Sequence, residues 1–329
     1  MSHNQQPVAR DAAIVSVVIP VYRNAGSLPT LYEKMVETIA ASGVGGYQFI
    51  FVNDGSDDGS WDILQDLASK DDNVLSINLS RNFGQHAANN AGFQHATGDI
   101  IVNMSADLQD PPEVIGQIVD KIYDGHDIVL AARSRVKESA FKRLTSWAHY
   151  RLIRISVKAY PSRGFDFWGV NKKAFKAFMS YNDVVRRNQT DLLSIGFDRT
   201  IIEYAKRERV HGKSQYNFIK RLDISISQIL ATAVWPLRLA AILGILFLVG
   251  GVLSAAFIIA RYFIADIQPT GWSSLVVIMS LTNGVVMAVL GVIGEYLWRI
   301  YYETKQRPMD PRPINPFLVS RPNGLPPLK

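Results

Sequence analysis

Cysteine is missing from all 329 residues, and its absence excludes disulfide bonds and thiolate metal ligands. The first 15 residues contain no apolar stretch of signal-peptide length, so we expect the first domain to stay on the side of a membrane where it is made. No G-x-G-x-x-G pattern follows the first predicted strand, which argues against a dinucleotide-binding fold.

Positive charge is scarce in the first part of the chain. Residues 1–130 carry 6 Lys or Arg against 17 Asp or Glu, although the whole chain has a net charge of +6. Basic residues gather in 133–158 and 206–221, which hold 8 and 6 Lys or Arg and one Glu each. Arg and Lys suit phosphates on a ligand or a membrane. We expect no nucleic-acid binding, because these clusters carry no nucleic-acid motif and lie beside long apolar runs, described below, that predict membrane spans.

Short apolar runs alternate with helical patterns over residues 14–132. The runs are rich in Val and Ile, as is typical of strands buried on both faces, and the alternation predicts an α/β fold with a mostly parallel sheet. The predicted strands are 14–21, 47–54, 73–80, 99–105 and 127–132, and the predicted helices are 27–42, 60–69, 84–96 and 112–124. Ligands bind beyond the carboxyl ends of such strands, where Asn53, Asp54 and Asp107 stand.

Two 22-residue runs without charge, 239–260 and 273–294, predict membrane-spanning helices at about 237–262 and 273–298. Lys and Arg flank the outer ends of this pair, and the link 265–272 has none, so we expect both outer ends on the cytoplasmic side. The resulting organisation is an α/β domain over 1–220, a juxtamembrane helix over 221–235, two spans within 236–299, and a Pro-rich cytosolic tail over 300–329.

Residues 141–160 mix Trp, Tyr, Leu and Ile with Arg and Lys at helical spacing. This pattern predicts an amphipathic helix at about 140–160, which lies either in the membrane interface or docked on the sheet.

The motifs VVIPVYRN, NDGSDDGS, SRNFGQ and ADLQDPPE, in this order, resemble those of the family-2 inverting glycosyltransferases. RERVHGKSQYNF, the two apolar runs and GEYLWRIYYETKQRP resemble the polyprenyl-phosphate branch of that family, in which bactoprenol glucosyltransferases and dolichol-phosphate mannose synthase are found. The resemblance covers residues 14–308 and implies a GT-A, Rossmann-like sheet with flanking helices, interfacial helices and a two-helix transmembrane hairpin.

The resemblance also implies site residues. The nucleotide-sugar would be held by Pro20, Tyr22, Asp54 and Asp107, and Mg²⁺ or Mn²⁺ by Asp107 and Gln109. Diphosphate or acceptor phosphate would be bound by Arg133, Arg207, Arg209, Lys213, Ser214 and Tyr216. Asp166 aligns with the acidic position that is catalytic in the bactoprenol enzymes.

Two departures from the family pattern stand out. The metal motif begins with Ser105 where most members have Asp, so a hydroxyl or a water would replace one carboxylate and weaken the affinity for a metal. Trp168 stands where the family usually has a basic residue, which fits a different donor sugar.

The resemblance implies inverting transfer of a sugar, with UDP-glucose as the leading donor, to undecaprenyl or another polyprenyl phosphate. Donor alternatives are GDP-mannose, UDP-N-acetylglucosamine and UDP-galactose. A non-catalytic membrane partner with a decayed transferase domain is a further alternative, which Ser105 favours. A nucleotidyltransferase would need a Gly-rich loop where this chain has VYRNAGS, and a processive synthase would carry QxxRW.

The implied partners are the nucleotide-sugar, the lipid acceptor, the membrane and further copies of the chain in a homotetramer. The expected location is the inner membrane, with several spans and with the catalytic domain and both termini in the cytoplasm.

Overall fold

The computed structural model describes residues 8–134, 151, 161, 164–181, 188–207, 271–304 and single positions between 242 and 264. The chain divides into two compact units. The first comprises Met1–Arg151, Ala159–Tyr216 and Pro308–Lys329, and the second Leu152–Lys158 and Asn217–Arg307.

The first unit is built on a seven-stranded sheet with the strand order β3-β2-β1-β4-β6-β5-β7. The strands are β1 (Ile14–Val21), β2 (Gly46–Asn53), β3 (Val74–Asn78), β4 (Ile100–Asn103), β5 (Ile128–Arg133), β6 (Phe167–Asn171) and β7 (Arg199–Tyr204). Only β6 is antiparallel to its neighbours. The predicted mostly parallel α/β sheet is therefore confirmed, and the five predicted strands match β1 to β5.

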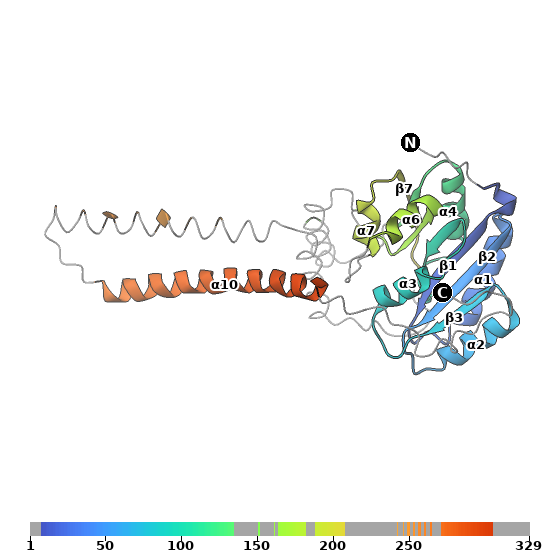
Figure 1. The fold of residues 1–329 in the computed structure, drawn as a ribbon, viewed down its shortest axis with the longest axis horizontal. Coiled ribbons are helices and arrows are strands. Elements are labelled where there is room, and N and C mark those ends of the chain that lie inside the picture. The colour runs from blue at the N-terminus through green and yellow to red at the C-terminus, as the bar shows by residue number, and fades with distance from the viewer. Residues whose placement is uncertain are drawn as a thin grey trace. The chain divides into compact units, whose positions relative to one another are not determined.

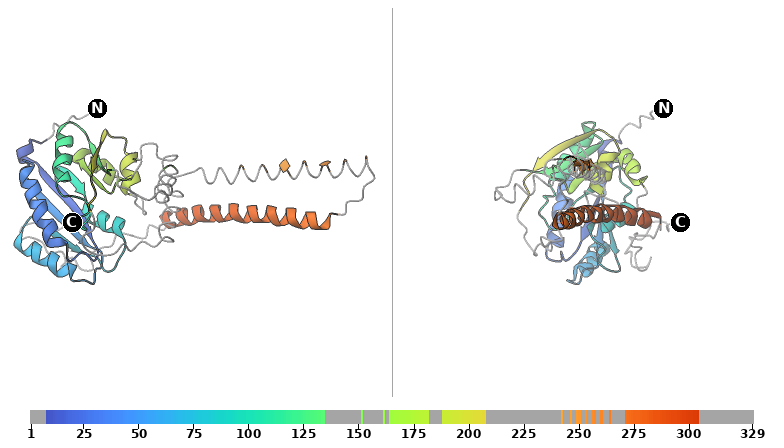
Figure 2. Two further views of the ribbon diagram at one scale, coloured as in Figure 1. Left: turned by 180° about the vertical axis from the view of Figure 1, so that it is seen from behind. Right: turned by 90° about the vertical axis from the view of Figure 1, so that its left-hand side faces the viewer.

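Helices cover both faces of this sheet (Figures 1 and 2). They are α1 (Leu28–Ala41), α2 (Ser60–Lys70), α3 (Gln85–Phe93), α4 (Val114–Tyr123), α6 (Lys172–Met179) and α7 (Asn188–Ser194), preceded by a short 3-10 turn at Arg10–Ala12. The four helices predicted between the strands correspond to α1 to α4, with ends that differ by a few residues.

The alternation of side chains along β1 explains why two helix layers are needed. Val15, Val17 and Ile19 are fully buried in a core shared with α1, α2 and α4. Val18 points to the opposite face, where a side chain at Gly92 of α3 would collide with it. Successive residues of a strand face opposite sides, so a strand that is apolar throughout must be covered twice.

Pro20 lies in β1, a central strand, although proline cannot donate a hydrogen bond to a sheet. β4 pairs with β1 only as far as Val18, opposite Asn103, so Pro20 lies beyond the end of that neighbour. On the other side it pairs with Val52 of β2. The shortness of β4 thus makes room for Pro20 at the edge where the strands end.

The second unit contains α10 (Trp272–Thr304), a helix of 33 residues. Within the part of the chain that the structure describes, no helix has both the length and the apolar character required for a bilayer span. Several predicted elements lie outside the described residues: the helix at about 140–160 apart from Arg151, the helix at 221–235, most of the span at 237–262, and the tail from 305 onward.

Candidate active site

Those predicted site residues that the structure describes gather where the parallel strands end. β1, β2 and β4 run in one direction, so the loops that follow them meet at one edge of the sheet. β6 runs the opposite way, with Trp168 opposite Asn103 of β4. Asp166 immediately precedes β6, and for this reason it reaches the same edge although it is remote in the sequence.

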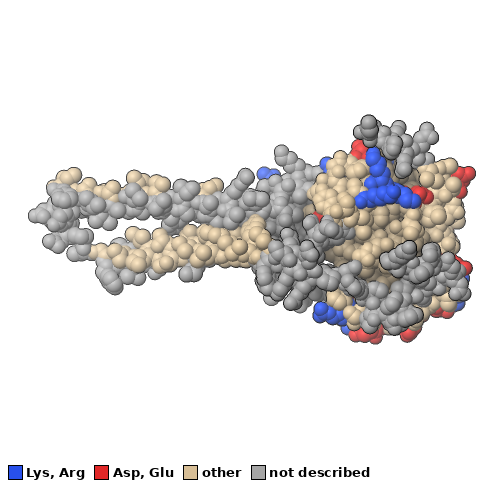
Figure 3. All heavy atoms as spheres, in the orientation of Figure 1, with Lys and Arg blue, Asp and Glu red and all other residues tan. Residues whose placement is uncertain are grey.

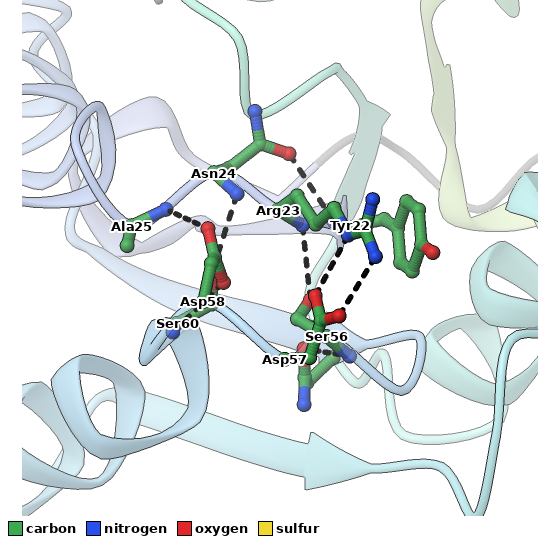
Figure 4. Close-up of polar contacts among 9 residues, drawn as sticks. Tyr22, Arg23, Asn24, Ala25, Ser56, Asp57, Asp58 and Ser60 are labelled. Atoms are coloured by element: carbon green, nitrogen blue, oxygen red, sulfur yellow. Dashed lines mark hydrogen bonds and ion pairs between the residues drawn. The ribbon is translucent and has the colours of Figure 1, made fainter. Parts of the chain in front are cut away.

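The loop after β1 is joined to the loop after β2, as Figure 4 shows. Three consecutive backbone N–H groups, those of residues 23–25, donate in order to Ser56 Oγ at 3.0 Å, Ser60 Oγ at 3.2 Å and Asp58 Oδ2 at 3.0 Å. The acidic turn NDGSDDGS therefore shapes the loop that carries Tyr22, and the two motifs form one structural element.

The side chain of Arg23 adds a paired contact between the same loops. Its Nε and one terminal nitrogen donate to the two carboxylate oxygens of Asp57, each at 2.7 Å. The guanidinium lies 5.4 Å from the centre of the Tyr22 ring. The hydrogen bond from Arg23 lowers the pKa of the Asp57 carboxyl, and the same bond raises the pKa of Arg23.

Asp54 is buried, with 3% of its surface exposed, and both of its oxygens accept backbone N–H groups. Oδ1 accepts from Phe83 at 2.7 Å and Oδ2 from Gly84 at 2.9 Å. Burial raises the pKa of Asp54, and the two N–H groups oppose this rise. In this structure Asp54 ties the SRNFGQ loop to the end of β2. Its contact with a nucleotide stays a prediction.

The SADLQD turn after β4 brings two carboxylates together through a hydroxyl. Ser105 Oγ lies 3.0 Å from Asp107 Oδ1 and 2.5 Å from Asp110 Oδ2. The backbone N–H of Gln109 also donates to Asp107 Oδ1, at 3.1 Å. Asp110 is 1% exposed, whereas Asp107 is partly exposed. Ser105 thus occupies the gap between the carboxylates that a third acidic side chain would fill.

Oxygen ligands of this kind suit Mg²⁺ or Mn²⁺. Such ions are often bound by only one or two protein carboxylates, and their remaining ligands are phosphate and water oxygens. Asp107, with the hydroxyl of Ser105 and the amide of Gln109 beside it in sequence, fits such a cation. Among the described residues, no group of three or more His, Cys, Asp or Glu could hold a metal ion. A cation here would therefore depend on oxygens of the ligand as well.

Asp110 links this turn to two strands on the far side of β4. The Tyr204 hydroxyl at the end of β7 donates to Asp110 Oδ1. Burial, followed by the charge of Asp110, raises the pKa of Tyr204, so this hydroxyl keeps its proton. Burial would lower the pKa of Arg133, but Asp166, Tyr204 and Asp110 outweigh it and raise that pKa. Arg133 is therefore a permanent positive charge at the site.

Asp166 is held on three sides. Its Oδ2 forms an ion pair with Arg133, and its Oδ1 accepts from Gln189 Nε2 at 2.7 Å. Its backbone carbonyl accepts from Asn103 Nδ2 at 2.9 Å. The carboxylate nevertheless keeps 41% of its side-chain surface exposed, so it can still face a ligand.

The segment after β7 lies against the SADLQD turn. The backbone N–H of Arg207 donates to the Gln109 carbonyl at 2.9 Å, and its guanidinium donates to Glu113 at 3.0 Å. Burial and the nearby Arg133 lower the pKa of Lys206, against the opposing effect of the carboxylates around it. The segment that leads into RERVHGKSQY therefore begins beside the predicted metal motif.

The structure brings eight of the twelve predicted residues to this edge, and the other four lie outside the described residues. Those brought together are Pro20, Tyr22, Asp54, Asp107, Gln109, Arg133, Asp166 and Arg207. Four predicted residues lie outside the described range: Arg209, Lys213, Ser214 and Tyr216. The same is true of most of both basic clusters, and residues outside the described range are drawn in grey in Figure 3. Sequence reasoning missed Asp110, Gln189, Tyr204 and Lys206.

Known proteins resemble this chain over nearly its whole length. A family model described as Glycosyl transferase family 2 matches residues 16–179. A Bacillus subtilis protein named Uncharacterized glycosyltransferase YkcC is 38% identical over 300 residues, which cover 89% of this chain and 91% of that protein. A Pseudomonas fluorescens protein named Undecaprenyl-phosphate 4-deoxy-4-formamido-L-arabinose transferase is 34% identical over 306 residues, covering 89% of this chain and 87% of that protein.

The fold also has a counterpart among solved structures. The crystal structure of a mycobacterial protein superposes with a TM-score of 0.50 at 15% identity, over 68% of this chain and 76% of that one. The sheet, the motifs at its carboxyl edge and the relatives that match nearly the whole chain lead to one conclusion: the chain belongs to family 2 of the glycosyltransferases.

Proposed function

We propose that this glycosyltransferase moves a sugar from a nucleotide-sugar to undecaprenyl phosphate or another polyprenyl phosphate, with inversion at the anomeric carbon. The observation that carries the proposal is the relative named as an undecaprenyl-phosphate transferase, which matches 89% of this chain, including the region beyond the sheet. UDP-glucose is the proposed donor. The sugar named for that relative, 4-deoxy-4-formamido-L-arabinose, is the second candidate because of this similarity.

The site's charges suit a reaction between two anions. Arg133 and the basic segment that begins at Lys206 would lower the repulsion between the donor diphosphate and the acceptor phosphate. A divalent cation near Asp107 would stabilise the negative charge that develops on the leaving diphosphate. Ser105 and Asp110 would hold Asp107 in place for that contact.

Asp166 is proposed to orient the reactants or to stabilise positive charge on the sugar. The acceptor phosphate has a second pKa of about 6, so it is mostly a dianion at neutral pH and needs no base to attack. Each oxygen of Asp166 already has a partner, Arg133 or Gln189. Such a carboxylate is better suited to a fixed electrostatic role than to accepting a proton.

The two charge-free runs are proposed to hold the chain in the inner membrane, with the sheet on the cytoplasmic side, so that the acceptor's phosphate reaches the site. The homotetramer also stays a prediction.

The direct test incubates the purified full chain with undecaprenyl phosphate and a panel of nucleotide-sugars, with Mn²⁺ or with EDTA. The panel contains the UDP derivatives of glucose, galactose, N-acetylglucosamine and 4-deoxy-4-formamido-L-arabinose, together with GDP-mannose. We expect a lipid-linked sugar from one donor, and more of it with Mn²⁺. Failure of every donor in the panel, with a preparation that binds nucleotide, would favour the non-catalytic alternative.

A further inference from the structure

Arg23 has a backbone conformation that is unusual for a residue with a side chain. Its φ is 55°, and among the described residues the only other non-glycine residue with a positive φ is Leu108. Both lie in loops at the edge where the strands end. This conformation is unfavourable for L-residues and persists where the surrounding structure enforces it, which is often at a functional site.

Core packing does not enforce the conformation, because 48% of the Arg23 side chain is exposed. It is held by polar contacts to the loop after β2: the bond from its own N–H to Ser56, and the paired bonds from its guanidinium to Asp57. An exposed ion pair usually adds little to stability. A strained residue fixed by such a pair is therefore hard to explain by stability alone.

These contacts restrict the position of the Tyr22 side chain. The guanidinium lies beside the Tyr22 ring and next to the Asp57 carboxylate in Figure 4. The N–H of Tyr22 donates to Asn24 Oδ1 at 3.2 Å, which fixes the backbone from which the ring projects. Aromatic rings are the usual platforms on which nucleobases stack. A ring whose position is set before the ligand arrives binds with less loss of freedom.

We propose that Arg23 and Asp57 form a clamp that positions Tyr22 for the base of the nucleotide ligand. The clamp is defined as these two side chains with their paired hydrogen bonds. It acts through Tyr22, so both are positioning residues, and it rests on the proposed function because it assumes a nucleotide donor. The clamp affects recognition of the base and leaves contacts with the diphosphate unchanged.

Calorimetric titration of the full chain with UDP, and separately with pyrophosphate, tests the clamp. Arg23→Ala and Asp57→Asn should each weaken UDP binding about fivefold to tenfold and leave pyrophosphate binding within twofold of wild type. In the transfer assay, KM for the donor should rise while kcat stays within twofold. Lys70→Ala is the matched control, because Lys70 and Asp66 form an exposed ion pair on α2, remote from Tyr22 in sequence.

Two further variants separate the clamp from the backbone strain. Arg23→Gly removes the strain and the guanidinium together, so it should fold readily and still lose UDP affinity. The exchange Arg23→Asp with Asp57→Arg restores a pair of opposite charges, and Asp tolerates a positive φ. This double variant should recover at least half of the binding free energy for UDP that Arg23→Ala loses.

Unchanged UDP affinity in Arg23→Gly and Asp57→Asn would overturn the clamp while leaving the proposed function intact. Equal losses for UDP and pyrophosphate would also overturn it, because they would show a general disturbance of the site. If the wild-type chain binds no nucleotide at all, the proposed function and the clamp fall together.

Discussion

At the scale of single residues, Ser105 determines which groups the carboxylates of the acidic turn contact. Its hydroxyl lies within hydrogen-bond distance of both Asp107 and Asp110, and its single proton can be donated to one carboxylate at a time. The sequence showed that a carboxylate was replaced. It could not show this arrangement, because the fold of the turn brings the three side chains together.

Ser105→Asp should raise the affinity for Mn²⁺ at least tenfold, because it adds a carboxylate ligand beside Asp107. Without metal, three acidic side chains would crowd the turn, so the melting temperature in EDTA should fall and Mn²⁺ should restore it. Mn²⁺ titration followed by electron paramagnetic resonance, with Ser105→Ala as control, measures the affinity. Equal Mn²⁺ affinity in all three proteins would contradict a metal site at this turn.

Asp166→Asn should reduce kcat by no more than about tenfold, which corresponds to roughly 1.4 kcal/mol in the activation barrier. The reason is that the acceptor is already ionised at neutral pH. Steady-state kinetics between pH 6 and 9 provide the measurement, with Gln189→Leu as a variant that loosens the carboxylate without removing it. A loss of several thousandfold, together with a flattened pH profile, would instead identify Asp166 as the base.

Acid pH should weaken the contact between Arg23 and Asp57 in a defined direction. The pKa of Asp57 is lowered in the folded chain, so its contribution to stability is fully present above its unfolded value of about 4. It is lost as the pH falls through the lower, folded value. The difference in free energy of unfolding between wild type and Asp57→Asn should be constant from pH 8 to pH 5 and shrink below about pH 4. Urea unfolding checks this, and a difference that grows toward acid pH would contradict it.

At the scale of secondary structure, the sequence predicted the first five strands well and missed the last two. β1 to β5 are apolar runs buried on both faces, which is the strongest signal a strand can give. β6 is a short strand with glycine at its centre, and β7 is an edge strand in which exposed and partly exposed residues alternate. Gln189 and Tyr204 went unnoticed as site residues because their partners, Asp166 and Asp110, are brought close only by the order of strands.

Gly55→Ala should destabilise the close backbone packing between the turn after β2 and the loop 81–84. Gly55 has a φ of +66°, and a Cβ there would lie 2.7 Å from the backbone nitrogen of Asn82. We expect a loss of about 2–4 kcal/mol in the free energy of unfolding, from strain and collision together. Gly59→Ala is the matched control, since Gly59 also has a positive φ but no neighbour within 4 Å. Gly59→Ala should lower the free energy of unfolding by only about 1 kcal/mol. Equal losses for both variants would contradict the close packing at Gly55.

At the scale of the whole molecule, the absence of cysteine makes the predicted membrane topology easy to examine. Any cysteine that is introduced is the only thiol in the chain. Asp266→Cys, in the link between the charge-free runs, should react with an impermeant maleimide in intact cells. Ser69→Cys, at the exposed end of α2, should react only after lysis. Labelling of both positions in intact cells, or of neither, would contradict the proposed hairpin.

The direction of β6 affects which part of the chain can vary in sequence among relatives. The chain leaves the sheet at Arg133 and returns at Asp166, and an ion pair joins these two residues. The two ends of the stretch from 134 to 165 are therefore held close together at the candidate active site. Because both attachment sites are fixed by the sheet, that stretch can change in length and composition without altering the alignment of the strands.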